Sequence, residues 1–287
     1  MSLDVHGFAD PWEHVRLLSD DVRNNAMIAL ITRRAPGARV LEVGCGTGLL
    51  SLIAARCGAS EVWAVEPTAL AEVARQLVRD NGLDGVVRVV ESTIEELDRR
   101  PVDLAFSELL NADPFLEGVV SASAAAARWV VGGGHLAPSR LRVWCAPVVC
   151  DAVAKERTRV SALLARLQAS YDLELGVLRD VLGGDETERT IVDKVRAVGE
   201  PVQLYDIALG EMIDLSERMS VTLRPTDSMD GVVVWFEAQL DDDVHLSNAP
   251  GQGGHWGQLQ FAFLEQVRGP CTIEVEVDEG ELDLRPA

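Results

Sequence analysis

The fold is decided by a short stretch near the start of the chain, Leu41-Glu42-Val43-Gly44-Cys45-Gly46-Thr47-Gly48. The apolar run RVLEV leads into it, and a segment rich in alanine and leucine follows, which predicts a strand, a glycine turn and a helix. Glycines permit positive φ and let the backbone approach a ligand closely. A dinucleotide-binding turn would place its third glycine one residue later, where Leu49 stands here. The stretch therefore predicts a ligand-binding turn that differs from the dinucleotide type.

Strands alternate with helices on the C-terminal side of this turn. The apolar runs are EVWAVE (61–66), VVRVVE (86–91) and VDLAFSE (102–108). Helical patterns separate them, and an alanine-rich helix around 121–131 ends at Gly132-Gly133-Gly134. Strands that are apolar throughout indicate a parallel sheet with both faces covered. We expect an α/β, Rossmann-like domain over residues 36–139. An N-terminal helical segment over residues 1–35, with a helical pattern from Pro11 to Arg34, would precede it and lie over the bound ligand.

The pattern changes after about residue 140. Residues 151–183 are helical in character, and short strands separated by turn residues dominate from residue 200 onward. These strands are VQLYDIAL, MSVTLRP, GVVVWFEAQL, WGQLQFAF and CTIEVEVD. Short strands at this spacing indicate an antiparallel barrel or sandwich. We expect a β-barrel domain over residues 140–287 with a helical insert at about 151–183.

Composition narrows the class of protein. The 287 residues carry a formal net charge of −20, which argues against nucleic-acid binding and suits either a cationic ligand or solubility alone. No apolar run approaches the length of a membrane span, and the N-terminus does not resemble a secretory signal. Five cysteines without CxxC pairs indicate reduced thiols and no metal site. We expect a cytoplasmic protein that binds neither membrane nor nucleic acid.

The glycine turn resembles motif I of the class I methyltransferases, which has the form E/D-x-G-x-G-x-G. The resemblance implies S-adenosylmethionine as cofactor, with S-adenosylhomocysteine as its product. The cofactor's amino-acid end would lie along the turn formed by Gly44, Gly46 and Gly48.

Three acids are candidates for cofactor binding. Glu66 ends the second strand, where a carboxylate can accept hydrogen bonds from both ribose hydroxyls; otherwise it is a solvent-facing acid beside a glycine turn. Glu42 could contact the cofactor or be structural. Glu95 occupies the family's position near the adenine and methionine portion, although alone it would be a helix-capping acid.

A second segment follows the fourth strand, at the carboxyl edge of the sheet where open α/β proteins bind ligands. It reads Ser107-Glu108-Leu109-Leu110-Asn111-Ala112-Asp113-Pro114-Phe115-Leu116-Glu117. A guanidinium is a planar fork of donors that carboxylates can hold bidentately, whereas two glutamates in a loop can also be merely structural. The segment resembles the double-glutamate loop of the protein arginine methyltransferases. The resemblance implies that Glu108 and Glu117 bind a guanidinium and keep positive charge away from the attacking nitrogen.

Near the N-terminus, residues 14–23 resemble this family's helix pattern H-x-x-M-L-x-D-x-x-R, with Leu17 replacing methionine. The resemblance implies that Arg23 and Leu17 bind the cofactor and that His14 binds the substrate. Asp20 lies one helical turn before Arg23.

Near the C-terminus, Gly254-His255-Trp256 resembles the family's threonine–histidine–tryptophan loop, which closes the substrate pocket from the barrel. The resemblance implies that His255 pairs with Asp20 as part of the catalytic set and that Trp256 contacts substrate. Taken alone, a histidine is usually a satisfied polar residue and a tryptophan usually belongs to the core. Four segments matching in the correct order over about 250 residues identify the chain as similar to the protein arginine methyltransferases.

Two departures bear on the substrate. Where the family has Y-F-x-x-Y before its first helix, this chain has Asp4, Val5 and Phe8, and where it has Trp-Met-Gly-Tyr the chain has residues 109–112. The chain also resembles relatives that methylate free arginine in natural-product pathways, and we see no appended recruiting module. We therefore expect free L-arginine as substrate and Nω-monomethyl-L-arginine as product, in antibiotic biosynthesis.

The sequence leaves alternatives open for the substrate, for the activity and for the role of the helical insert. Arginine in a peptide or protein could be the substrate, or the chain could be a catalytically silent scaffold that binds the cofactor. The helical insert lies where the family carries its dimerisation arm, which implies a homodimer, although a helix pair could also simply cover a face of the barrel.

Overall fold

The computed structural model describes residues 11–175, 177–178 and 188–287. Two helices open the described chain, α1 (Pro11–Ser19) and α2 (Asp21–Arg34). The helical pattern from Pro11 to Arg34 corresponds to two helices, because the chain breaks at Asp20. Asp20 has φ −84° and ψ 96°, and its carboxylate accepts a hydrogen bond from the Arg23 backbone N–H, so it caps α2 instead of continuing α1.

A five-stranded parallel sheet follows, in the order β3-β2-β1-β4-β5. Its strands are β1 (Arg39–Val43), β2 (Glu61–Val65), β3 (Val87–Val90), β4 (Val102–Ser107) and β5 (Val130–Ala137). The connections include α3 (Leu49–Arg56), α4 (Leu70–Asp80), the 3₁₀ turn η1 (Ile94–Glu96) and α5 (Val119–Ala127). Alternate residues of one strand face different cores: Val40 packs in one apolar cluster and Leu41 in another. This two-sided burial is why the strands are apolar throughout.

The second half of the chain is antiparallel. One sheet has the order β7-β12-β10-β6-β8, with β11 paired to β10, and another has the order β14-β13-β9. The strands are β6 (Arg140–Val148), β7 (Glu188–Val192), β8 (Val202–Ala208), β9 (Met219–Leu223), β10 (Ser228–Asp241), β11 (Val244–Ser247), β12 (Gln258–Arg268), β13 (Cys271–Asp278) and β14 (Glu281–Pro286). The Rossmann-like sheet followed by an antiparallel sheet domain confirms the expected fold class.

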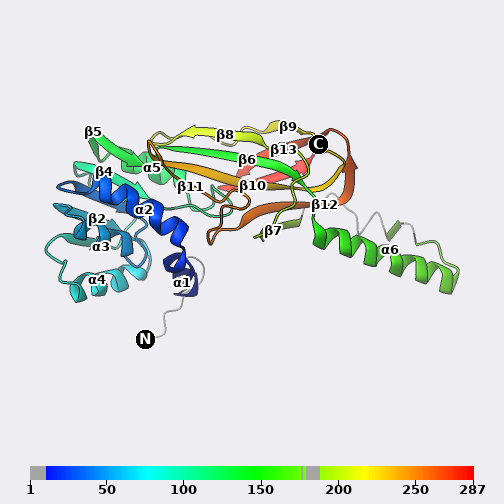
Figure 1. Cartoon of the computed structure of the whole chain (residues 1–287), viewed down its shortest axis with the longest axis horizontal. Helices are drawn as coiled ribbons and strands as arrows, with labels where there is room; N and C mark the ends of the chain where they lie inside the picture. Colours follow the sequence, from blue (N-terminus) through cyan, green and yellow to red (C-terminus); the bar gives the residue numbers. More distant parts are fainter. Residues whose placement is uncertain (1–10, 176, 179–187) are drawn as a thin grey trace.

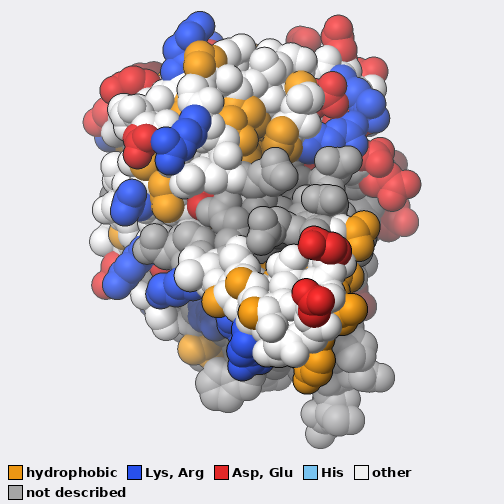
Figure 2. Space-filling model, turned by 90° about the vertical axis from the view of Figure 1, so that its right-hand side faces the viewer, with side chains coloured by type: hydrophobic (Ala, Val, Ile, Leu, Met, Phe, Trp, Pro, Cys, Tyr) orange, Lys and Arg blue, Asp and Glu red, His pale blue; other side chains and the backbone are white. Residues whose placement is uncertain are grey.

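The helix α6 (Asp151–Tyr171) leaves the strand domain between β6 and β7 and projects from the end remote from the parallel sheet (Figure 1). Part of the expected helical insert, residues 176 and 179–187, lies outside the described residues. At this end of the molecule, hydrophobic side chains are exposed among charged ones (Figure 2). Those on and just after α6 include Leu163, Tyr171 and Leu173. No helix within the described residues is long and apolar enough to cross a membrane.

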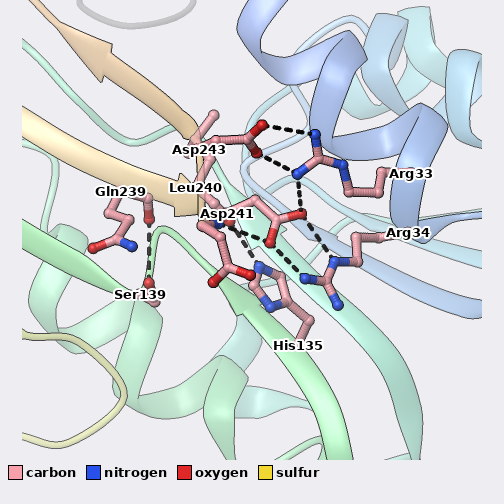
Figure 3. A network of polar contacts seen from close by, with 9 residues as sticks. Arg33, Arg34, His135, Ser139, Gln239, Leu240, Asp241 and Asp243 are labelled. Carbon is pink, nitrogen blue, oxygen red and sulfur yellow. Dashed lines mark hydrogen bonds and ion pairs between the residues drawn. The ribbon is translucent and has the colours of Figure 1, made fainter.

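A network of charged side chains joins the two halves of the chain between α2, β5 and the end of β10 (Figure 3). Arg34, the last residue of α2, donates to both oxygens of Asp241, whose side chain is completely buried at the end of β10. Arg33 binds Asp241 and the exposed Asp243. The ring of His135, from β5, contacts the Leu240 carbonyl oxygen at 2.7 Å through Nε2. Helix α2 is thereby fixed to the strand domain at its C-terminal end.

Candidate active site

The glycine turn between β1 and α3 needs its glycines for two different reasons. Gly44, Gly46 and Gly48 have φ of 72°, 54° and 84°, a region that other residues adopt at a cost. Space is also lacking, since a Cβ at Gly44 would lie 2.6 Å from the Leu109 Cδ2. At Gly48 it would lie 3.2 Å from the Ala74 Cβ. The Leu109 contact brings the turn directly against the double-glutamate loop.

Glu66 lies immediately after β2 and is buried. One carboxylate oxygen accepts the Gly46 N–H at 2.8 Å, and the other accepts the N–H and the hydroxyl of Thr68. These bonds hold the carboxylate at the mouth of the glycine turn. A carboxylate oxygen has further lone pairs with which to accept a ribose hydroxyl.

The other two candidate acids have very different surroundings. Glu42 is buried within β1, and the Ser51 hydroxyl donates to its carboxyl group. Burial raises the pKa of Glu42 to about 8, against the opposing effect of the Ser51 hydrogen bond. Glu95 lies in η1 with its side chain exposed. Of the three acids, Glu66 has the geometry best suited to a ribose.

Glu108 follows β4 and its side chain is almost completely enclosed. Its side chain is 4% exposed, and the Arg23 Nε donates a hydrogen bond to its Oε2. Its other oxygen, Oε1, is buried and has no partner among the described residues. Burial raises the pKa of Glu108, and the nearby Arg23 charge opposes this shift. A buried carboxylate oxygen without a donor is costly unless a ligand supplies one.

Glu117 approaches Glu108 from the far end of the same loop. The Asn111 amide donates to Glu117 Oε1 at 3.0 Å. Burial raises the pKa of Glu117 to about 7; the Asn111 hydrogen bond lowers it and the negative charge of Glu108 raises it further. The electrostatic coupling shows that the loop brings the two predicted acids together, although they are nine residues apart in sequence.

Asp20 and His255 meet across 235 residues of sequence. The Nδ1 of His255 lies 2.7 Å from Asp20 Oδ2, and the His255 backbone N–H donates to the same oxygen at 2.8 Å. Burial would raise the pKa of Asp20, but the hydrogen bonds from Arg23 and His255 together lower it. The structure thus forms the pair that the sequence resemblance implies.

Trp256 is buried beside His255 and its indole N–H is already used. It donates to the Leu110 carbonyl oxygen at 2.8 Å, and its ring meets Phe236 edge-on at 5.3 Å between centroids. The Asn248 amide donates to the Gly257 carbonyl oxygen at 2.7 Å, which fixes the other side of the turn. Trp256 therefore joins the barrel to the double-glutamate loop, a role that the prediction of substrate contact did not include.

The remaining predicted residues belong to the N-terminal helices. Arg23 is expected to hold the cofactor carboxylate; in the structure its Nε donates to Glu108 and one terminal nitrogen donates to Asn24 Oδ1 at 3.0 Å. Leu17 is half-buried in α1, and its carbonyl oxygen accepts the Asp20 N–H. His14 also lies in α1, but its side chain is outside the described residues, as are Asp4, Val5 and Phe8.

Asp113, in the same loop, has a structural role that was not predicted from the sequence. Its carboxylate is buried and accepts the Phe115 N–H at 3.0 Å, the Leu282 N–H at 2.8 Å and the Arg189 guanidinium. The Asp-Pro dipeptide at 113–114 is a turn signal, but nothing in the sequence indicates partners in β7 and β14. Asp113 ties the substrate loop to the C-terminal hairpin.

The comparisons with known proteins agree with this geometry. Residues 40–134 match the family described as a methyltransferase domain. The chain is 28% identical over 296 residues to protein arginine N-methyltransferase PRMT10 of Arabidopsis thaliana, covering 90% of this chain and 76% of the relative. It is also 28% identical over 276 residues to arginine N(omega)-methyltransferase of Streptomyces achromogenes subsp. streptozoticus, covering 90% and 74%. The crystal structure of Arabidopsis thaliana protein arginine methyltransferase 10 superposes with a TM-score of 0.79 at 22% identity, covering 96% of this chain and 92% of that one.

This chain has a methyltransferase domain and is similar over most of its length to the protein arginine methyltransferases. Enzymes with this domain take their methyl group from S-adenosylmethionine, so the predicted cofactor is confirmed at the level of the domain. The residues present fit that cofactor. Glu66 has acceptor oxygens at the strand end, and a Cβ would fill the space at Gly44. No group of His, Cys, Asp and Glu side chains suited to a metal occurs within the described parts of this methyltransferase.

Proposed function

We propose that this methyltransferase modifies a terminal nitrogen of the arginine guanidinium, with free L-arginine as substrate and Nω-monomethyl-L-arginine as product. The observation that carries the proposal is the pair Glu108 and Glu117, two largely buried acids at the carboxyl edge of the parallel sheet. Because burial of unpaired charge is unfavourable, two such acids favour a cationic ligand. A guanidinium supplies a positive charge and donors in one plane.

The proposed mechanism is direct displacement: the bond from the attacking nitrogen to the methyl carbon forms as the sulfonium–methyl bond breaks, S-adenosylhomocysteine leaves, and the extra proton on the methylated nitrogen is released. S-adenosylmethionine supplies an electrophilic methyl group on a sulfonium, and Glu66, Arg23 and the glycine turn would hold that cofactor. Glu108 and Glu117 orient the guanidinium and concentrate its positive charge near the carboxylates, which leaves the attacking nitrogen with more electron density. Positioning of the two reactants contributes most of the acceleration. The Asp20–His255 pair lies near Glu108, and we expect it to complete the substrate site there.

The free-arginine proposal rests on the departure of residues 109–112 from the family's Trp-Met-Gly-Tyr pattern. Leu109 packs on the glycine turn and Leu110 is tied to Trp256, so these two residues support the loop from within. One relative, from Streptomyces, is named an arginine N(omega)-methyltransferase, whereas PRMT10 is named a protein arginine N-methyltransferase. Together with free arginine as substrate, we propose that the enzyme acts in a natural-product pathway and is located in the cytoplasm.

The test is to incubate the purified chain with S-adenosylmethionine and either L-arginine or an arginine-glycine-rich peptide, and to detect methylarginine by mass spectrometry. Methylation of L-arginine alone supports the proposal. Methylation of the peptide alone would make the enzyme a protein arginine methyltransferase. Failure with both substrates, while the cofactor still binds, would refute the guanidinium assignment.

We also propose that the enzyme is a homodimer assembled through α6. Leu163, Tyr171 and Leu173 are 43%, 67% and 54% exposed on or just after this projecting helix. A helix that projects from the molecule with exposed apolar residues is suited to pack on a second copy. Light scattering after size-exclusion chromatography should give twice the chain mass, and Leu163→Asp combined with Tyr171→Asp should halve it. A monomeric wild-type protein would contradict the proposal.

A further inference from the structure

We propose that Asn111 is a positioning residue for the reaction, which holds one oxygen of Glu117 so that a single oxygen of this carboxylate is presented to the substrate guanidinium. This inference rests on the proposed function. It assigns a role to a residue at which the loop departs from the family's Trp-Met-Gly-Tyr pattern.

The orientation of the Asn111 amide is determined by its two partners. Its Oδ1 accepts the Ala112 backbone N–H at 2.7 Å, and a backbone N–H can only donate. Its Nδ2 consequently faces Glu117 Oε1, at 3.0 Å. An ionised carboxylate can only accept hydrogen bonds. Turning the Asn111 amide around would therefore lose its hydrogen bonds to both Glu117 and Ala112.

Glu108 is held in the same manner by a different residue. The Arg23 Nε donates to Glu108 Oε2, and Glu108 Oε1 is left buried without a partner. In Glu117, Oε1 is held by Asn111, and no donor to Oε2 occurs among the described residues. Each acid therefore has one oxygen engaged by the protein and one available. The free oxygens, one on each acid, are the acceptors that we expect a guanidinium to meet first.

The hydrogen bond also affects the charge of Glu117. Burial raises its pKa to about 7, and among charged groups Glu108, at the end of β4, raises it further while Arg23, on α2, lowers it. Asn111 lowers it by donating to the ionised form. Without this donor the pKa of Glu117 would rise further, and the acid would be mostly protonated at neutral pH.

Two variants separate positioning from general support of the loop. Asn111→Asp is isosteric and can still accept the Ala112 N–H, but it lacks the donor and places a second acid beside Glu117. Asn111→Leu removes both polar groups at similar volume. Asn81→Leu is the matched control, because Asn81 makes its side-chain hydrogen bond to Leu77 at the exposed end of α4.

The first measurement is the pH dependence of kcat/KM with L-arginine for the full chain. The acid limb should move upward by about 1 pH unit in Asn111→Leu and further in Asn111→Asp, as expected when a hydrogen bond to a charged group is lost. The affinity for S-adenosylmethionine should change less than about 3-fold, because the side-chain hydrogen bonds of Asn111 go to Glu117 and Ala112 and not to the glycine turn. Asn81→Leu should keep the wild-type profile.

The second measurement does not need activity. In protein labelled with ¹³C at the glutamate carboxyl carbon, the Glu117 signal, assigned with Glu117→Gln, should titrate at higher pH in both Asn111 variants. An unchanged Glu117 titration in both would overturn the inference, whatever the substrate proves to be. A shifted titration in an enzyme that methylates no arginine compound would support the pairing and refute only the proposed function.

Discussion

At the scale of single residues, the site depends on acids whose ionisation is controlled by burial. Glu108 and Glu117 lie close enough for the charge of one to raise the pKa of the other. Such a pair favours a cation that neutralises both. Arg23 and Asn111 hold this pair, each through a hydrogen bond to one oxygen of an acid.

Glu108→Gln and Glu117→Gln should each reduce kcat by about 10²–10³-fold with L-arginine, because each removes a charge that stabilises the guanidinium in the transition state. The affinity for S-adenosylmethionine, measured by calorimetry, should be nearly unchanged. Glu72→Gln, on the exposed side of α4, is the control and should keep wild-type turnover. An equal loss of cofactor affinity in the two site variants would contradict the assigned roles.

Glu42 provides a test of stability against pH. Its pKa is about 8 in the folded chain and near 4.5 when unfolded, so between these values the unfolded state binds fewer protons. Glu42 therefore lowers the free energy of unfolding progressively as pH rises from about 4.5 to 8. Glu42→Gln imitates the protonated form and can still accept the Ser51 hydrogen bond. Thermal melts from pH 5 to 8.5 should show a weaker pH dependence in this variant, and a loss of stability at every pH would argue against a neutral Glu42.

The identities of these residues could be predicted from the sequence, but the contacts that orient them could not. Glu108, Glu117, Arg23 and His255 stand at fixed positions in segments that resemble a known family. Asn111 and Asp113 occupy positions where the loop departs from that pattern. Their partners depend on the path of the loop backbone, which no periodicity encodes.

At the scale of the elements, the break between α1 and α2 positions Asp20, although the hydrophobic spacing of the sequence continues across it. Val15, Leu18 and Val22 have helical spacing across the break, so the sequence predicts a helical pattern on both sides of it. The break places Asp20 at the N-terminus of α2, where one oxygen caps the helix and the other accepts from His255. Similarly, Gly132-Gly133-Gly134 was expected to end a helix but lies inside β5. There, a Cβ at Gly134 would meet the Asp103 carbonyl oxygen at 2.9 Å.

Substitutions of Asp20 should separate its role as the cap of α2 from its contact with His255. Asparagine is also a good helix cap, so Asp20→Asn should stay within about 0.5 kcal/mol of wild type, whereas Asp20→Ala should lose about 1–2 kcal/mol of stability. Both variants should lose activity, because the charge facing His255 is gone. Urea unfolding together with kcat measures the two effects, with the exposed Asp21→Ala as control. Full activity in Asp20→Asn would show that the charge of Asp20 does not matter to the reaction.

At the scale of the whole molecule, the charged network of Figure 3 joins α2 to the strand domain. Arg34 holds the pKa of Asp241 well below its usual range despite the opposing effect of burial. A lowered pKa means that the contribution of this pair to stability is complete above the unfolded value of 3.8 and is lost as pH falls below it.

Arg34→Ala should reduce the free energy of unfolding by about 2 kcal/mol at pH 7, since it leaves the buried Asp241 without its main partner. The difference from wild type should shrink as pH is lowered through 4 and 3, as Asp241 becomes protonated. Asp243→Ala breaks only an exposed pair with Arg33 and should have little effect. Denaturant titrations across this pH range provide the measurement, and equal effects of the two substitutions would show that the network has no buried component.

The contacts between the substrate loop and the strand domain have a consequence for how substrate specificity can be inherited. Leu110 and Asp113 belong to the first half of the chain, yet their partners, Trp256, Leu282 and Arg189, all belong to the second half. A recombination event at the boundary between the two sheets would join the substrate loop of one protein to the strand domain of another, whose contact residues had not been selected with that loop. Transplanting the parallel-sheet domain alone would carry cofactor binding into a new protein without a formed acceptor site. For this enzyme, the unit that natural or laboratory evolution can exchange is the whole chain.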